Sequence, residues 1–275
     1  MGKGKASDWV YFFIPTTILL AMALFAVVST NHDSREAEER RFVSAVVEGD
    51  VDEIRALLPR YSDHALASEA QAALTDDGRD VLDLLNERKI QIAATGVDIQ
   101  NISLAITNLT SHGINVTVPA GTYFMPFNAS TQTMISTAEV SVRVGSWGSA
   151  PVSVAAVCAS LPRNIPTRAD MFGIGRAPAH ADFARLMPVL AQARVVYPVQ
   201  QAAVWIISDD ANYTELGHLS AAGVVRIINE PDVATAMRIV DSAGIDITQR
   251  RIWSAREYIV SQLPESDIKS WLAER

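Results

Sequence analysis

The sequence contains a single cysteine, Cys158, so the chain can form no intramolecular disulfide. A single thiol also excludes iron–sulfur clusters, attached c-type haem and zinc sites built from several thiolates, because each needs more cysteines. Cys158 lies in the apolar stretch 154–159. This surrounding predicts a buried residue that packs as a small hydrophobe rather than a reactive thiol.

Runs of lysine or arginine are also missing, and the formal net charge is −8. Nucleic acid is therefore excluded as a partner, because binding its phosphates needs a basic face. The five histidines are far apart and form no metal-binding spacing, and no nucleophile elbow or phosphate loop is present. The histidines are His32, His64, His112, His180 and His218. We therefore expect no catalytic residues, no metal site and no cofactor.

One acidic stretch could suggest calcium, because Asp209, Asp210, Asn212 and Glu215 supply four oxygen donors within seven residues. The stretch lacks the glycine and the terminal glutamate of an EF-hand loop. It is predicted to be a polar loop at the end of a helix.

Charge is scarce in the middle of the chain, where Glu139 and Arg143 are the only charged residues between 99 and 162. Soluble sheets normally carry charges on their outer faces and edges, which prevent pairing with other sheets. An uncharged outer face predicts that something covers it. The candidates are helices of the same chain, a partner subunit or lipid headgroups.

An uncharged apolar run spans 9–30, which is long enough to cross a bilayer, so we predict a transmembrane helix at 9–31. The alternative is a cleaved signal peptide, but no clean cleavage site follows the run. Lysine and arginine are nearly balanced on the two flanks, so charge says little about the orientation. A short N-terminal tail before a large C-terminal part fits a cytoplasmic tail at 1–8 and a periplasmic C-terminal part. The residues expected to anchor the chain are Trp9, Tyr11, Phe12, Phe13, Pro15, Leu19, Leu20 and Phe25.

Three segments are expected after this helix, in an α+β fold. Segment 32–95 has apolar residues at helical spacing and is predicted to be an acidic helical spacer. Segment 96–165 alternates apolar and polar residues between turn sequences, which predicts an antiparallel β-sandwich. Segment 166–275 is predicted to be a C-terminal helical domain, with prolines at first helical turns.

Two resemblances accompany these expectations. The stretch 48–58 resembles the helix pair of an ankyrin repeat, without its full signature. The predicted helix at 9–30 has no ionisable side chain and is followed by soluble segments. This layout resembles that of single-pass scaffold subunits of bacterial respiratory or photosynthetic reaction-centre complexes. That resemblance concerns organisation and includes no shared motif.

The resemblance implies a non-catalytic accessory subunit that binds integral membrane proteins of a larger complex and the lipid bilayer. Aromatic residues of the β segment are the expected partner contacts: Tyr123, Phe124, Phe127 and Trp147. The alternative is a stand-alone, membrane-tethered periplasmic binding or sensing protein. An enzyme is a third and weaker hypothesis, because no catalytic set can be named.

Overall fold

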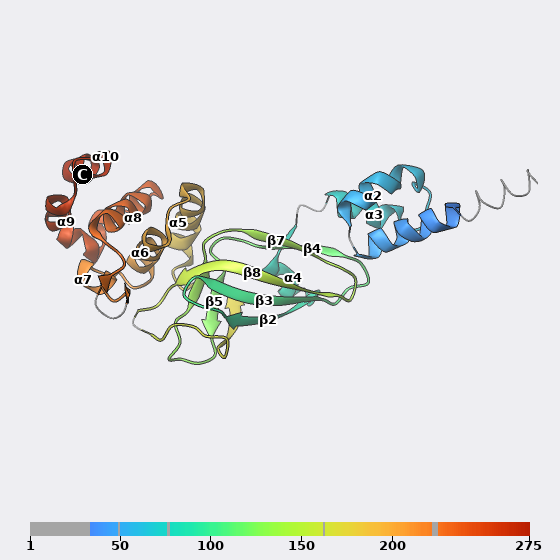
Figure 1. Ribbon diagram of the computed structural model, residues 1–275, viewed down its shortest axis with the longest axis horizontal. Coiled ribbons are helices and arrows are strands. Elements are labelled where there is room, and N and C mark those ends of the chain that lie inside the picture. Colours follow the sequence, from blue (N-terminus) through green and yellow to red (C-terminus); the bar gives the residue numbers. More distant parts are fainter. Residues whose placement is uncertain (1–33, 49, 76–77, 162, 222–224) are drawn as a thin grey trace, which may run out of the picture.

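The computed structural model describes residues 34–48, 50–75, 78–161, 163–221 and 225–275. Figure 1 shows three parts in a row along the long axis of the molecule. Helices α2 and α3 lie at one end, the strands occupy the middle, and helices α5 to α10 lie at the other end.

Residues 34–48 form the first described helix. The later α-helices are α2 (Val51–Leu57), α3 (Ala67–Thr75), α4 (Val81–Asn86), α5 (His180–Ala193), α6 (Tyr197–Ser208), α7 (Tyr213–Leu216), α8 (Glu230–Ser242), α9 (Arg256–Gln262) and α10 (Asp267–Glu274). Short 3-10 helices span Leu58–Arg60, Ile247–Gln249 and Arg251–Ala255. The strands are β1 (Arg79–Asp80), β2 (Ile90–Gly96), β3 (Asn101–Asn108), β4 (Ile114–Val118), β5 (Tyr123–Pro126), β6 (Met134–Ser136), β7 (Val140–Val144), β8 (Ser149–Cys158), β9 (Met171–Gly175), β10 (Ser220–Ala221) and β11 (Val225–Arg226).

Six strands close into a barrel in the order β2-β3-β8-β6-β5-β9, with every neighbouring pair antiparallel. A second sheet has the order β1-β4-β7. The alternation in the sequence explains which side chains face inward. On β3, Ile102, Leu104 and Ile106 are fully buried, whereas the residues between them are more exposed.

The prediction of a β-sandwich at 96–165 is therefore wrong. The barrel also uses β2, which begins in the segment predicted to be helical spacer, and β9, which lies in the segment predicted to be helical. These two strands close the barrel by pairing Ala94 with Phe172 and Thr95 with Met171. Alternation of apolar and polar residues identifies a strand and its buried face. It does not specify which strands pair, so it cannot predict that the strands close into a barrel.

Within the described ranges, no helix is long and apolar enough to cross a membrane. The most continuously buried helix, α6, has 12 residues, whereas a span needs about 20. The predictions of a transmembrane fold and a single-pass location with a periplasmic domain are corrected on this finding and are not carried further. The span predicted at 9–31, with the anchoring residues named there, and the tail 1–8 lie outside the described residues.

The buried residues form two separate hydrophobic cores. The larger core runs continuously through both sheets and the C-terminal helices. The smaller core belongs to the N-terminal helical unit, which comprises helix 34–48, α2 and α3. Its members are Phe42, Ala45, Val46, Ile54, Leu57, Ala70 and Ala73.

A buried glutamine joins the barrel to the C-terminal helices. Gln201 on α6 is fully buried and contacts both polar backbone groups of Cys158, the last residue of β8. Its side-chain oxygen accepts from the Cys158 N–H at 3.0 Å, and its side-chain nitrogen donates to the Cys158 carbonyl at 2.6 Å. The hydroxyl of Tyr197 donates to the same glutamine oxygen at 2.9 Å. Cys158 itself is free and buried, as the sequence predicts.

Candidate functional site

The outward wall of the barrel is uncharged across four neighbouring strands and the residue that follows β5. Strand pairing places Ser153 of β8 beside Ser103 of β3, and Ser103 beside Thr95 of β2. Thr95 pairs with Met171 of β9, whose carbonyl accepts a hydrogen bond from the N–H of Phe127 at 2.9 Å. These outward positions form one continuous surface without a formal charge.

None of the described helices covers this wall. Outward positions on β2, β3 and β8 are exposed, among them Ala93, Ala105, Pro151 and Ser153. The sequence offered three candidates for covering this wall: helices of the same chain, a partner subunit or lipid headgroups. The described helices of this chain do not cover it.

The wall ends in three large exposed apolar side chains, which we call the apolar ridge: Met125, Phe127 and Met171. Their exposed fractions are 43%, 73% and 51%. Two glycines of β9 allow this arrangement. A Cβ at Gly173 would lie 3.5 Å from the Phe127 ring, and a Cβ at Gly175 would lie 3.1 Å from the Met125 Cε. Phe127 and Met125 therefore lie over the backbone of β9 at its two glycines.

Basic residues occur in the segment that carries Met171 of the ridge. Segment 163–176 leads into and through β9 and contains three exposed arginines, which we call the basic rim: Arg163, Arg168 and Arg176. The only carboxylate in this segment, Asp170, accepts hydrogen bonds from the Thr131 hydroxyl at 2.7 Å and from the Thr167 N–H at 2.8 Å. These hydrogen bonds, that of Thr131 foremost, lower the pKa of Asp170. The segment is thus locally positive in an acidic chain.

The four partner contacts expected from the sequence differ in their exposure to solvent. Tyr123 and Phe124 are buried, and the Tyr123 hydroxyl donates to the Thr133 hydroxyl at 3.0 Å. Phe127 and Trp147 are exposed. Trp147 lies in the turn before β8, where its N–H donates to the Thr110 carbonyl, and it is not part of the ridge.

Sequence reasoning missed two members of the ridge, Met125 and Met171. A signal for Met171 existed in segment 171–175, where Gly173 and Gly175 occupy the next positions on the same face of a strand. Such spacing fits a strand with one bare face, but glycine lowers strand propensity and hides it.

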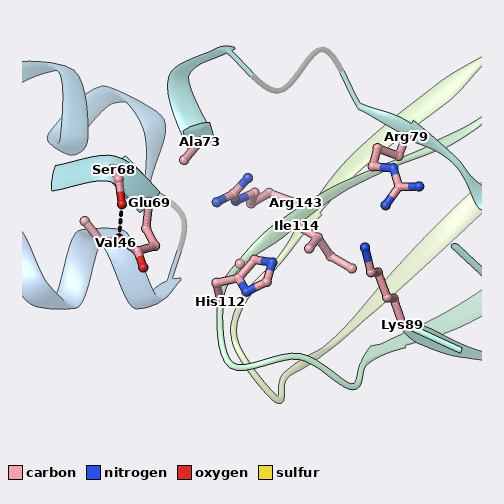
Figure 2. Close-up of a pocket in the computed structure, with 10 residues that line it drawn as sticks. Val46, Ser68, Glu69, Ala73, Arg79, Lys89, His112, Ile114 and Arg143 are labelled. Carbon is pink, nitrogen blue, oxygen red and sulfur yellow. Dashed lines mark hydrogen bonds between the residues drawn. The ribbon is translucent and has the colours of Figure 1, made fainter. Parts of the chain in front are cut away.

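A second candidate site is a cavity of about 380 Å³ between the N-terminal helical unit and the β1-β4-β7 sheet (Figure 2). We call it the cationic cavity because its described lining residues include two arginines and a lysine, against one carboxylate. Its lining residues are Val46, Ser68, Glu69, Ala73, Arg79, Lys89, His112, Gly113, Ile114 and Arg143.

Arg143 extends from β7 toward the helices, with Glu69 on the opposite wall (Figure 2). Its Nε and one terminal nitrogen are buried. The guanidinium lies across Gly113, where an added Cβ would be 3.0 Å from the other terminal nitrogen. Glycine at this position therefore makes room for the guanidinium inside the cavity.

The other charged groups of the cationic cavity are held by local contacts. Glu87, which is exposed beside it, accepts from both Arg79 and Lys89, the latter at 2.9 Å. These two contacts lower the pKa of Glu87 to about 2. The Ser68 hydroxyl donates to Glu69 at 2.8 Å and is the first cause of the lowered pKa of Glu69. Both carboxyl groups are consequently ionised at neutral pH.

Residues 209–212 form a loop after α6, as predicted, whereas Glu215 lies in the short helix α7. Asp209 accepts from the Leu161 N–H at 2.9 Å, and Asp210 accepts from the Arg251 N–H at 3.0 Å. Asn212 and Glu215 form a capping box at the start of α7. Among the described residues, no group of three or more His, Cys, Asp or Glu side chains is arranged to hold a metal ion.

No protein-family model, no curated protein and no solved structure matches this chain. The comparisons therefore contain nothing that links it to a photosynthetic or respiratory complex, and that part of the sequence-based expectation is not carried further.

Proposed function

We propose that the barrel is a non-catalytic docking module, through which the chain serves as an accessory subunit of a larger protein complex. Its ligand is a partner protein that places apolar side chains on the apolar ridge and carboxylates on the basic rim. The observation that carries this proposal is the 73% exposure of Phe127, flanked by the exposed Met125 and Met171. Aromatic and methionine side chains are enriched in the centres of protein interfaces.

The surroundings of the ridge support a protein partner. Burying one large apolar side chain contributes about 1.5–3 kcal/mol, so a ridge of three supplies a plausible interface centre. The uncharged wall of serine, threonine and alanine beside it can be desolvated without stranding a formal charge.

Charge selects the class of partner. The basic rim has three arginines, and the single carboxylate near them is bound by Thr131 and Thr167. An acidic partner is attracted to this rim, whereas the chain as a whole, at −8, repels acidic proteins elsewhere on its surface. The partner would therefore be oriented by charge before the apolar contacts form.

The mode of binding follows from barrel closure. Each barrel strand pairs with two neighbours, so no barrel strand presents an edge that is open over its full length to a partner strand. Docking through outward side chains is the mode that remains for this surface.

Photo-crosslinking tests this proposal. A photoreactive residue is introduced at Thr95, beside the ridge, in the full chain expressed in its source cells, and the crosslinked product is identified by mass spectrometry. The captured protein is then purified and its affinity measured against Phe127→Glu and against Tyr258→Glu, a matched control at an exposed aromatic residue far along the chain.

We expect one discrete product, binding that weakens as salt rises, and loss of binding only in Phe127→Glu. A product of twice the chain mass would assign the ridge to self-association and overturn the choice of partner. Equal binding by both variants would show that the ridge is not the docking surface.

A further inference from the structure

We propose that Met125 and Met171 of the apolar ridge are a reversible oxidation site, at which a peroxide converts each thioether to a sulfoxide and thereby releases the docked partner. This regulation rests on the docking function proposed above. Hydrogen peroxide is the oxidant, and a methionine sulfoxide reductase with a thiol as electron donor reverses the step.

The fold exposes sulfur-containing side chains at one place. Among the described residues, the exposed ones are Met125 and Met171, at 43% and 51%. The other methionines of the described chain and its cysteine are buried, with exposed fractions of 2% or less: Met134, Met187, Met237 and Cys158. Oxidation by a dissolved peroxide follows the exposure of the sulfur, so the fold directs the reaction to the apolar ridge.

Strand β9 leaves Met125 uncovered on one side. On the outward face of this strand, Met171 is followed by Gly173 and Gly175. Gly173 pairs with Met125 of β5, and a Cβ at Gly175 would lie 3.1 Å from the Met125 Cε. Neither glycine has a side chain to shield the thioether, so Met125 stays open to small solutes from this side.

The chemistry favours the thioethers over the thiol. A thiol reacts as its thiolate, and burial raises the pKa of Cys158 to about 12. A thioether carries no proton on sulfur and reacts directly. Its lone pair attacks one oxygen of hydrogen peroxide, the S–O bond forms and the O–O bond breaks.

The electrons and protons balance in both directions. In the forward step, the proton of the transferred oxygen passes to the departing hydroxide and forms water. Each sulfur loses two electrons, which reduce the peroxide. In the reverse step, two thiols supply two electrons and two protons, and the products are the thioether, a disulfide and water.

A sulfoxide weakens the apolar contact that docking uses. Oxidation turns an apolar side chain into a polar one with a hydrogen-bond acceptor. Burying this oxygen against apolar groups leaves it without a donor, so each oxidised methionine should weaken docking by about 10- to 100-fold. Phe127, whose N–H donates to the Met171 carbonyl, is not oxidised by peroxide, so the ridge recovers when the sulfoxides are reduced.

The first measurement needs no partner. The folded full chain is treated with hydrogen peroxide, and peptide mass spectrometry follows the sulfoxide at each described methionine. We expect Met125 and Met171 to react at least about tenfold faster than Met134, Met187 and Met237. Similar rates at all five would contradict the site. Sulfoxides that a methionine sulfoxide reductase with dithiothreitol leaves unreduced in the folded chain would contradict its reversibility.

The second measurement uses the partner captured by photo-crosslinking. Its affinity is measured for each chain before and after peroxide, which is removed before the partner is added. Wild type should lose affinity by tenfold or more and regain it with the reductase. The double variant Met125→Leu with Met171→Leu should keep its own starting affinity after peroxide, because leucine has no sulfur. Met237→Leu, at a buried methionine, is the matched control and should respond as wild type does.

The outcomes separate regulation from docking. If the oxidised wild type binds as before while Phe127→Glu does not bind, the regulation is wrong and docking on the ridge stands. If the double variant also loses affinity after peroxide, the sensitive group lies elsewhere and the assignment to these methionines is wrong. Equal binding by Phe127→Glu and wild type would refute docking on the ridge, and the regulation with it.

Discussion

One carboxyl group, that of Asp170, positions the segment that leads into β9. Asp170 binds Thr131 and Thr167, which are 36 positions apart in the sequence, and its pKa is lowered mainly by the Thr131 hydroxyl. A group whose pKa is depressed by folding stabilises the folded state above its ordinary pKa of 3.8, and this contribution is lost as pH falls through the lower folded value.

The Asp170→Asn variant should therefore be less stable than the wild type at pH 7, and the difference should shrink below about pH 4. Urea unfolding at pH 7, 4 and 3 measures it. Asp63→Asn, at an exposed carboxylate, controls for the change in net charge. A difference between Asp170→Asn and wild type that stays constant over this range would contradict the assignment.

A single thiol provides a second residue-scale prediction. Burial raises the pKa of Cys158 to about 12. The thiolate is the reactive form, so alkylation of the folded chain at pH 8 should be slower than that of an ordinary cysteine by on the order of a thousandfold. Labelling with iodoacetamide, followed by intact mass, should modify Cys158 only after denaturation. Rapid modification of the folded chain would refute its burial.

At the scale of elements, the contact between α6 and β8 depends on Gln201. Replacing it with leucine leaves the N–H and the carbonyl of Cys158 buried without their partners. Each such loss costs about 1–3 kcal/mol, so Gln201→Leu should lower the free energy of unfolding by about 2–5 kcal/mol. Chemical denaturation measures this change. Gln200→Leu is the matched control, because Gln200 contacts only the Val195 carbonyl near the surface, and it should cost less than about 1 kcal/mol. Equal effects of the two variants would show that the contact contributes nothing specific.

Individual elements could be predicted from the sequence where one local signal dominated. Alternation within segment 96–165 indicates β3, β4 and β7. The expectation of prolines at first helical turns is confirmed for α8, where Pro231 lies in the first turn and Gly244 follows the helix at a positive φ of 72°. The strands that close the barrel were missed for opposite reasons. On β2 the last two inward residues are small, Ala94 and Gly96, so the alternation of apolar and polar residues is weak there. On β9 the glycines lower the strand propensity.

Sites were less predictable than elements. Phe127 could be proposed from its aromatic character and uncharged neighbourhood, but Phe124 shares both and is buried. The cationic cavity could not be proposed, because its charged residues lie between positions 69 and 143 on different elements. Only the fold brings them together.

At the scale of the whole molecule, the two cores predict two unfolding units. Phe42 is fully buried in the smaller core and stacks on Tyr61 at 5.0 Å. Phe42→Ala should destabilise the N-terminal helical unit by about 3–5 kcal/mol and leave the barrel intact.

Hydrogen exchange read by mass spectrometry checks this prediction. Phe42→Ala should accelerate exchange in residues 34–75 and leave that of β3 and β8 unchanged. Phe183→Ala, in the larger core, should give the reverse pattern. Faster exchange over the whole chain in both variants would indicate one cooperative unit.

The pairing of β2 with β9 also sets an order on synthesis. The barrel joins Ala94 to Phe172, so it cannot close until the chain beyond β9 has left the ribosome. The smaller core needs nothing beyond Ala73 and can form while the strands are still being made. During that interval the uncharged strands β3 and β8 are exposed without their final neighbours. A slow stretch of translation after residue 175 would therefore favour closure over misassembly.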